Sequence, residues 1–163
     1  MMEGTSVLSR DFSLWKYPTS RLGEVCEVKD GTHESPKYVV SGTGFPLVTS
    51  KNLASGTVDL RDVNYISRVD FNSINQRSKV DKGDILMPMI GTIGNPVLVT
   101  DSPNYAIKNV ALIKFDEKSP CNEYVLRALS SSYFSDVFTS SARGGTQQFI
   151  SLGDIRDFIN HWC

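Results

Sequence analysis

Apolar and polar residues follow a helical period in one long stretch of this chain. Apolar side chains recur every four residues from Val125 to Val137, and neighbouring aromatic residues widen the same face. This spacing is typical of an amphipathic helix that packs one face on a core. The sequence therefore predicts one helix over 119–138.

Short apolar runs separated by polar loops predict β-strands in the middle of the chain. The candidates are 46–48, 56–60 and 110–113, and the last is a continuous apolar run, as in a strand buried on both faces. Shorter helices are predicted from Asp70, the candidate N-cap, to Ser78 and within 151–159. Because strands and helices do not alternate in βαβ order, we expect an α+β fold: one domain with a curved, mainly antiparallel or mixed sheet and helices near the ends.

The stretch GDILMPMIGTIGNPVLV, from Gly83 to Val99, tests whether the chain carries the phosphate-binding loop of an enzyme. Gly91 and Gly94 lie three apart, but Asn-Pro follows Gly94 where a P-loop needs Lys and then Ser or Thr. A dinucleotide-binding loop needs a third glycine and a following helix, whereas the proline and the valines after it favour a strand. The stretch is therefore predicted to form a strand, a glycine turn and a second strand.

Length and composition fit one ordinary globular domain. The 163 residues include 40% hydrophobic and 21% charged residues, which suits a single domain with a sizeable core. The first residues do not resemble a signal peptide, and prolines and glycines interrupt the longest uncharged stretch, 85–100, so no membrane partner is predicted. Cys26, Cys121 and Cys163 are odd in number, far apart and without zinc-ligand spacing, so we expect no disulfide framework and a cytoplasmic location.

The net charge of −1 does not by itself indicate a nucleic-acid partner, so the positions of the charges carry more information. Four windows lack Asp and Glu, hold basic residues and are rich in small polar residues: 35–58, 71–80, 102–115 and 137–153. Chance segregation is the alternative for any one window. Together the windows favour a surface that faces an anion.

The reactive residue types form no catalytic or cofactor-binding pattern. His33 and His161 are far apart and belong to no Ser-His-Asp or Cys-His pattern, and the sequence has no glycine-rich cofactor loop and no methyltransferase motif of the PPY type. Asp116–Lys118 formally matches the acid-x-Lys half of a nuclease motif, but the expected upstream Pro-Asp is absent. The sequence therefore predicts a protein without enzymatic activity, cofactor or metal site.

Five segments, taken in order, closely resemble the target recognition domain of type I restriction–modification specificity (S) subunits. They are LGEVCEVKDGTHESPKY, FPLVTSKNL, VDKGDILMPMIGTIGN, NYAIKNVALIKF and GGTQQFISLGDI, and the resemblance covers about residues 15–159. It implies a non-catalytic reader of one half-site of a split target in double-stranded DNA. It also implies two partners: the methyltransferase (M) subunit, which methylates an adenine there, and the motor and nuclease (R) subunit.

The chain departs from the family pattern after GDIRDF. Members normally continue into a long spacer helix and carry a second recognition domain, whereas INHWC ends this sequence. We therefore expect a single recognition domain over 1–163, with the spacer helix and second recognition domain absent. Either an excised domain or a naturally truncated half-subunit fits this pattern, and a second specificity half is a further expected partner.

Candidate DNA contacts are side chains on loops that can reach base edges or phosphates, chiefly Arg, Lys, Asn, Gln, Ser and Thr. In and beside the acid-free windows these are Thr32, His33, Lys37, Tyr38, Ser50, Lys51, Asn52, Arg77, Lys79, Thr92, Asn95, Lys108, Asn109, Arg143, Thr146, Gln147 and Gln148. For each of them the alternative is a solvated loop residue or a side chain that stabilises a turn. Tyr38 fits a core position equally well.

Two other classes of function stay open. One is a small metal-dependent nuclease built on Asp116–Lys118, and the other is a protein-interaction domain that ignores DNA. Neither accounts for five ordered motifs as simply as a DNA-recognition domain does.

Overall fold

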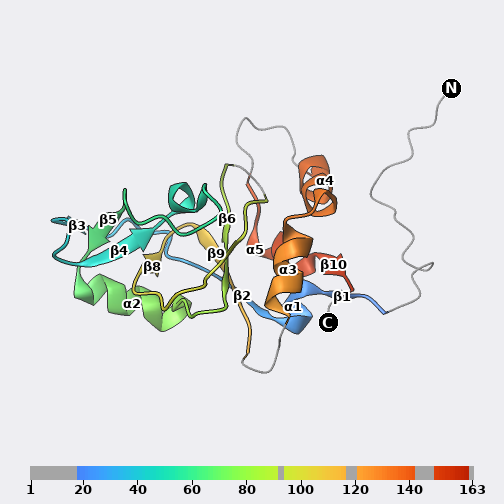
Figure 1. Ribbon diagram of the computed structural model, residues 1–163, viewed down its shortest axis with the longest axis horizontal. Coiled ribbons are helices and arrows are strands. Elements are labelled where there is room, and N and C mark those ends of the chain that lie inside the picture. The colour runs from blue at the N-terminus through green and yellow to red at the C-terminus, as the bar shows by residue number, and fades with distance from the viewer. Residues whose placement is uncertain (1–17, 92–93, 117–120, 142–148, 162–163) are drawn as a thin grey trace.

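A four-stranded antiparallel sheet forms the centre of the molecule (Figure 1). The computed structural model describes residues 18–91, 94–116, 121–141 and 149–161. The strand order is β2–β9–β6–β7, formed by Glu27–Asp30, Val110–Lys114, Ile85–Pro88 and Val97–Leu98 respectively. Every pair in this sheet is antiparallel. The pairing of β2 with β9 places two segments that are far apart in the sequence side by side.

A second four-stranded sheet lies at the left end of the molecule in Figure 1. Its order is β3–β5–β4–β8, formed by Tyr38–Val39, Asn64–Ile66, Phe45–Val48 and Ala106–Ile107. Strands β4 and β8 run parallel, and the other pairs are antiparallel. Helix α2 (Arg68–Ser78) covers this sheet, because its Phe71 and Ile74 pack on Leu47, Ile66 and Ala106.

The opposite end of the molecule is mainly helical (Figure 1). Its described elements are α1 (Leu22–Val25), α3 (Asn122–Leu129), α4 (Ser132–Ser141), α5 (Leu152–Asp157) and a ribbon of β1 (Ser20–Arg21) with β10 (Ile159–Asn160). A short 3-10 helix, η2 (Ser50–Leu53), follows β4 at the sheet end. No helix in the described part of the chain is long and apolar enough to cross a membrane.

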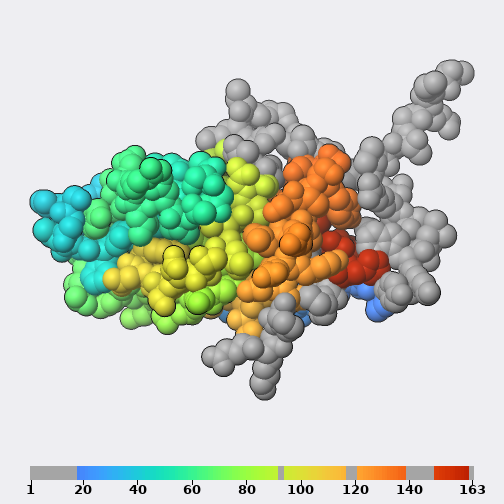
Figure 2. Space-filling view, in the orientation of Figure 1, coloured from blue at the N-terminus to red at the C-terminus, as the bar shows by residue number. Residues whose placement is uncertain are grey.

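The central strands are buried on both faces, as the continuous apolar run at 110–113 predicts. Ala111 and Ile113 of β9 belong to the core beneath the helices, while Val110 and Leu112 belong to the core on the other side. Side chains alternate between the faces of a strand, so β9 serves two cores at once. In Figure 2 yellow-green residues lie between the turquoise sheet end and the orange helices.

The prediction of an α+β fold is confirmed, with strands in two four-stranded sheets instead of one. The strand–turn–strand prediction for 83–99 is also confirmed, because β6 pairs with β7 in antiparallel fashion. Gly91 and Gly94 have φ of 92° and 95°, a left-handed conformation that glycine adopts without a steric penalty. Helix α2 ends at Ser78 as predicted, but Ser67 is its N-cap, with Oγ accepting a hydrogen bond from the Asp70 N–H at 3.1 Å.

Two predictions of secondary structure are wrong. The stretch 119–138 does not form one helix: α3 and α4 are separated at Ser130 and Ser131. The stretch 56–60 forms no strand, and β5 at Asn64–Ile66 pairs with β4 instead. In both places polar side chains bind backbone groups that a longer helix or strand would use.

Candidate nucleic-acid interface

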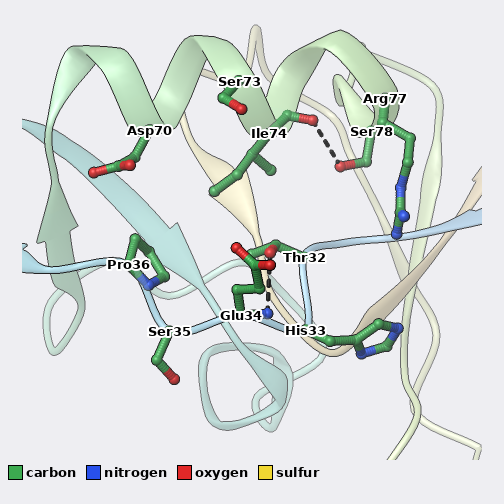
Figure 3. Close-up of a pocket in the computed structure, with 10 residues that line it drawn as sticks. All are labelled: Thr32, His33, Glu34, Ser35, Pro36, Asp70, Ser73, Ile74, Arg77 and Ser78. Carbon is green, nitrogen blue, oxygen red and sulfur yellow. Dashed lines mark hydrogen bonds between the residues drawn. The ribbon is translucent and has the colours of Figure 1, made fainter.

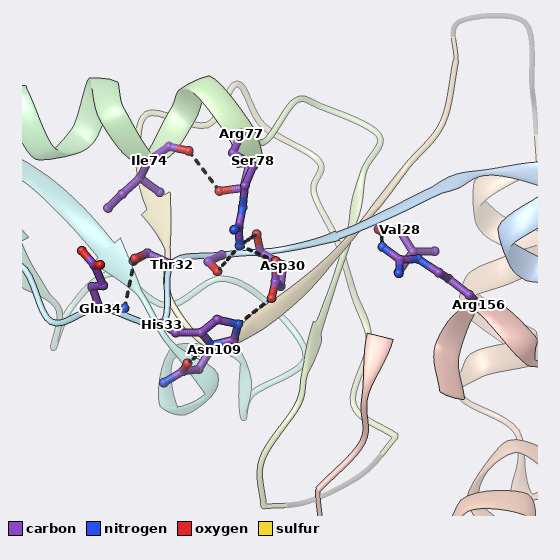
Figure 4. Close-up of polar contacts among 11 residues, drawn as sticks. Val28, Asp30, Thr32, His33, Glu34, Ile74, Arg77, Ser78, Asn109 and Arg156 are labelled. Carbon is purple, nitrogen blue, oxygen red and sulfur yellow. Dashed lines mark hydrogen bonds and ion pairs between the residues drawn. The ribbon is translucent and has the colours of Figure 1, made fainter. Parts of the chain in front are cut away.

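Three segments that are far apart in the sequence meet at the inner end of the second sheet (Figure 4). They are the loop after β2, the connection between β8 and β9, and the last turn of α2. Thr32 forms a parallel bridge with Lys108, and the Asn109 N–H donates to the Thr32 carbonyl at 3.1 Å. Arg77 reaches the same loop from α2. The structure thus brings together Thr32, His33, Arg77, Lys108 and Asn109, which the sequence proposes separately as DNA contacts.

The backbone at this junction is closely packed. A Cβ at Gly31 would lie 2.2 Å from the Ile107 carbonyl oxygen, so no larger residue fits without a shift of backbone. Asn109 has φ of 53°, a left-handed conformation that Asn tolerates better than most residues do. These two positions fix the loop after β2 against β8 and aim its side chains.

The Asp30 carboxylate lies between two cationic side chains (Figure 4). Its Oδ2 is 2.5 Å from Nε2 of His33, and its Oδ1 accepts a hydrogen bond from Nη2 of Arg77. Nη2 of Arg77 also donates to the Gly31 carbonyl at 3.1 Å. The side chains of Arg77 and His33 remain 61% and 59% exposed, whereas that of Asp30 is only 16% exposed. The acid is therefore the inner, fixed member of the group, and the cations face solvent.

The hydrogen bonds around His33 favour its charged form. Nδ1 lies 2.8 Å from Oδ1 of Asn109 and Nε2 lies 2.5 Å from Asp30, so both ring nitrogens can donate when the ring is protonated. The bond to Asn109 and then the bond to Asp30 raise the pKa of His33, and the charge of Arg77 acts weakly in the opposite direction. At neutral pH this raises the fraction of imidazolium at the surface.

A hollow of about 430 Å³ lies beside this group, between the loop after β2 and helix α2 (Figure 3). Residues Thr32 to Pro36 line one wall, and Asp70, Ser73, Ile74, Arg77 and Ser78 line the other. On the loop side, Lys108 donates a hydrogen bond to the Ser35 hydroxyl. Glu34 and Asp70 line the hollow together with Arg77. This lining therefore suits a ligand that carries both hydrogen-bond donors and acceptors better than a bare phosphate.

Other predicted contacts lie on the surface but outside this group. Lys37 and Tyr38 are exposed and continue the same loop into β3. Lys51 lies 3.0 Å from Asp62, and Lys79 lies 2.8 Å from Asp81, in exposed ion pairs. Such pairs are worth little and do not prevent a lysine from reaching a phosphate. The remaining described candidates are half-buried Ser50 and exposed Asn95, while Thr92, Arg143, Thr146, Gln147 and Gln148 lie outside the described residues.

Asn52 does not fit the role of a base contact. Its side chain is buried, at 3% exposure. Nδ2 donates to the carbonyls of Asp59 and Asp62 at 3.0 and 2.9 Å, and Oδ1 accepts from the Thr49 N–H at 3.0 Å. This amide holds the 49–62 segment together, so we remove Asn52 from the set of candidate DNA contacts.

Asp30 is the residue of the site that the sequence predictions miss. Asp30 precedes the first acid-free window and carries the negative charge that these windows lack, so they do not indicate it. The sequence feature that could have indicated Asp30 is its position directly before Gly31, at the end of a strand in the motif VKDGTH. Only the fold shows that Arg77 lies opposite it.

The described residues show no arrangement for metal-dependent catalysis. They contain no group of three His, Cys, Asp or Glu side chains that could hold a metal ion. Of the candidate nuclease motif Asp116–Lys118, the described part of the chain includes only Asp116.

The described cysteines offer no reactive thiol. Burial raises the pKa of the free thiol of Cys26 to about 12, which makes it a poor nucleophile. Cys121 is disulfide-bonded, which the odd number and wide spacing of the cysteines do not predict.

Comparison with known proteins places this fold. No protein-family model matches the chain, and no curated protein sequence matches it. A chain solved in work on the complex assembly and conformational transition of the type I R-M system matches 88% of this chain, with a TM-score of 0.58 and 19% identity. The HsdS subunit from Thermoanaerobacter tengcongensis matches 87%, with a TM-score of 0.59 and 16% identity. The type I restriction–modification S subunit from M. genitalium matches 87%, with a TM-score of 0.53 and 13% identity.

These structures share the fold of this chain over nearly its whole length. The chain in turn spans about one third of theirs: 33%, 32% and 33%. The fold implied by the five sequence motifs is therefore confirmed: the chain folds like part of a type I specificity subunit.

Proposed function

We propose that this chain is a target recognition domain that reads one half-site of a split target in double-stranded DNA. The observation that carries the proposal is the convergence of His33, Arg77, Lys108 and Asn109 from three segments, in a fold shared with S subunits. Guanidinium and ammonium groups bind phosphates and guanine edges, and an amide can pair with adenine. This group therefore combines phosphate anchors with groups that can distinguish bases.

The exposed side chains beside this group extend the proposed interface. Lys37 and Tyr38 follow along the loop, and Lys37 has no ion pair among the described residues. Lys51, Lys79 and Asn95 are proposed as further contacts because they are exposed and of a suitable residue type, and half-buried Ser50 is proposed by its residue type alone. Thr92, Arg143, Thr146, Gln147 and Gln148 stay in the proposal on sequence grounds alone.

The proposal gives the chain no catalytic role and no cofactor. Methylation and cleavage would come from the M and R subunits of a type I complex, and a second specificity half would read the other half-site. Residues 1–163 would form a single recognition domain in the cytoplasm, where the protein would meet DNA and these partners. The likeness to chains of type I systems supports these partners as a class.

The first test measures salt-dependent binding to duplex DNA. A preferred sequence is first selected from a pool of randomised duplexes, and affinities are then measured for that sequence and for random duplex at several salt concentrations. Replacing Lys37 with alanine should weaken binding to all duplexes about equally and reduce the salt slope by roughly one unit, because one phosphate contact is lost.

Lys82→Ala is the matched control. Lys82 is also exposed but lies in the turn before β6, where the next residue, Gly83, accepts a hydrogen bond from Asn122 of α3. This variant should leave affinity and salt slope unchanged. Absence of duplex binding by the unmodified chain at low salt, or binding without salt dependence, would overturn the proposed function.

A further inference from the structure

We infer that Asp30 is a positioning residue that raises sequence discrimination while lowering overall affinity for DNA, by holding His33 and Arg77 in fixed directions. The inference rests on the proposed function and goes beyond it, because Asp30 is not among the residues expected to touch DNA. An acid repels phosphate, so its place inside a cationic group calls for a physical role.

The carboxylate is itself held in place by the fold. Asp30 is the last residue of β2, where it pairs in register with Ala111 of β9. Its side chain is 16% exposed, and its two oxygens are used separately, one for each cation. The two cations come from different elements, a loop and a helix. The carboxylate therefore fixes their separation as well as their directions.

Each cation has a second anchor that completes the arrangement. Nη2 of Arg77 donates to the Gly31 carbonyl at 3.1 Å, and Nδ1 of His33 lies 2.8 Å from Oδ1 of Asn109. The result is a chain of contacts, Arg77–Asp30–His33–Asn109, that ties α2, the loop after β2 and the β8–β9 connection together (Figure 4). These contacts restrict the directions of the Arg77 and His33 side chains.

This restriction changes what Arg77 can do with DNA. In the described part of the chain, every hydrogen bond of its guanidinium uses Nη2. The hydrogens on Nη1 and Nε stay available in a fixed direction, on a side chain that is 61% exposed. An arginine side chain that is free to move can bind the nearest phosphate in any sequence. An arginine held in one direction donates hydrogen bonds only to a base edge at the matching position. Removing Asp30 should therefore increase non-specific binding and reduce discrimination.

The test compares the whole chain with Asp30→Asn, which keeps the shape of the side chain and removes its charge. Affinity for random duplex should rise several-fold, and the salt slope should steepen by up to about one unit, because an arginine is released toward phosphates. The ratio of affinities for the selected and random duplexes should fall by roughly 10-fold or more. NMR titration should show a lower pKa for His33 than in the unmodified chain, because the hydrogen bond to the Asp30 carboxylate raises it.

Two further variants separate positioning from charge and from folding. Arg77→Lys keeps the charge but cannot bridge Asp30 and the Gly31 carbonyl in the same way, so it should keep affinity for random duplex and lose discrimination. Asp157→Asn makes the same charge change at an exposed ion pair with Arg21, 3.5 Å apart in the helical end. This control should leave both the affinity and the ratio unchanged.

The outcomes distinguish the inference from the proposed function. If the unmodified chain binds duplex DNA but Asp30→Asn retains its discrimination, or loses affinity for all sequences by the same factor, Asp30 is not a specificity-determining residue. If the unmodified chain binds no duplex at low salt, the proposed function itself fails. Loss of discrimination in both Asp30→Asn and Arg77→Lys, with undiminished binding to random duplex, supports the inference.

Discussion

At the scale of single residues, His33 makes the proposed interface sensitive to pH. Its contacts with Asn109 and Asp30 raise the pKa of the imidazole, while the nearby charge of Arg77 lowers it slightly. Duplex affinity should therefore decrease as pH rises through the raised pKa, because the interface loses one positive charge. The measurement is a pH series of binding constants at fixed salt, alongside the NMR titration of His33.

The same shift has a consequence for folding. Because the folded pKa lies above the unfolded one, protonation of His33 stabilises the fold fully at pH values below the unfolded pKa, and this contribution disappears as pH rises through the folded pKa.

Two variants test the dependence of DNA affinity on pH. His33→Gln should abolish the decrease in affinity with rising pH, and Asn109→Ala should move that decrease to lower pH. A flat affinity profile in the unmodified chain, across the range where His33 titrates, would show that this ring does not face DNA.

At the scale of elements, side-chain hydrogen bonds explain where sequence patterns fail. The apolar period runs from Val125 to Val137 without a break. However, the Ser130 hydroxyl donates to the Leu126 carbonyl at 2.7 Å, and the Ser131 hydroxyl donates to the Ala128 carbonyl at 2.6 Å. The Ser131 oxygen then accepts from the Phe134 N–H at the start of α4. Two serines thus end one helix and begin the next, which hydrophobic periodicity cannot register.

The central strands were predictable for a complementary reason. Burial on both faces leaves a continuous apolar run at 110–113, and a proline with two glycines marks the turn after β6. By contrast, β5 has three residues, one of which is buried, so it leaves little pattern to detect. A strand buried on both faces leaves a continuous apolar run in the sequence. A short strand such as β5 leaves no such run, and its formation depends on the strands that pair with it.

Asn52 provides an element-scale prediction about the 49–62 segment. Replacing Asn52 with alanine removes donors to two carbonyls and the acceptor for the Thr49 N–H. We expect the free energy of unfolding to fall by about 1–3 kcal/mol, as for buried polar groups that lose their partners. Urea denaturation followed by circular dichroism measures this loss.

Base preference should not change in Asn52→Ala under conditions where the variant is folded. Asn104→Ala is the matched control, because Asn104 is exposed and lies outside the proposed DNA contacts, so its replacement should change stability by less than about 0.5 kcal/mol and leave base preference unchanged. A changed base preference in Asn52→Ala without loss of stability would return Asn52 to the candidate DNA contacts.

At the scale of the whole molecule, residue types alone could predict which segments carry candidate contacts but not how they meet. Thr32, His33 and Arg77 stand out by type and by their neighbours, and the β8–β9 connection adds Lys108 and Asn109. Their convergence depends on antiparallel pairing of β2 with β9 and on α2 packing across the second sheet. Burial likewise separates Asn52 from its equally polar neighbours. The convergence of these segments and the burial of Asn52 both depend on three-dimensional packing, which the local composition of the sequence does not reveal.

The same central sheet should make the chain unfold as one unit, which is the last prediction. Leu112 and Ile113 are fully buried neighbours in β9 that face different cores, one toward the second sheet and one toward the helices. Alanine at either position should lower the free energy of unfolding by about 2–5 kcal/mol. Because β9 belongs to both cores, each variant should retain a single transition, and hydrogen exchange should accelerate at both ends of the molecule.

Val69→Ala on α2 is the control, since Val69 is 78% exposed and its replacement should change stability by less than about 0.5 kcal/mol. Two separate transitions, or faster exchange confined to the end nearest the substitution, would show two independent units and contradict a single recognition domain. Ile113 lies on the face directed away from the second sheet, so Ile113→Ala should reduce DNA binding only in proportion to the unfolded fraction. In a cooperative sheet, the fraction of molecules that carry the folded site around Asp30 therefore depends on how well the helices pack at the opposite end.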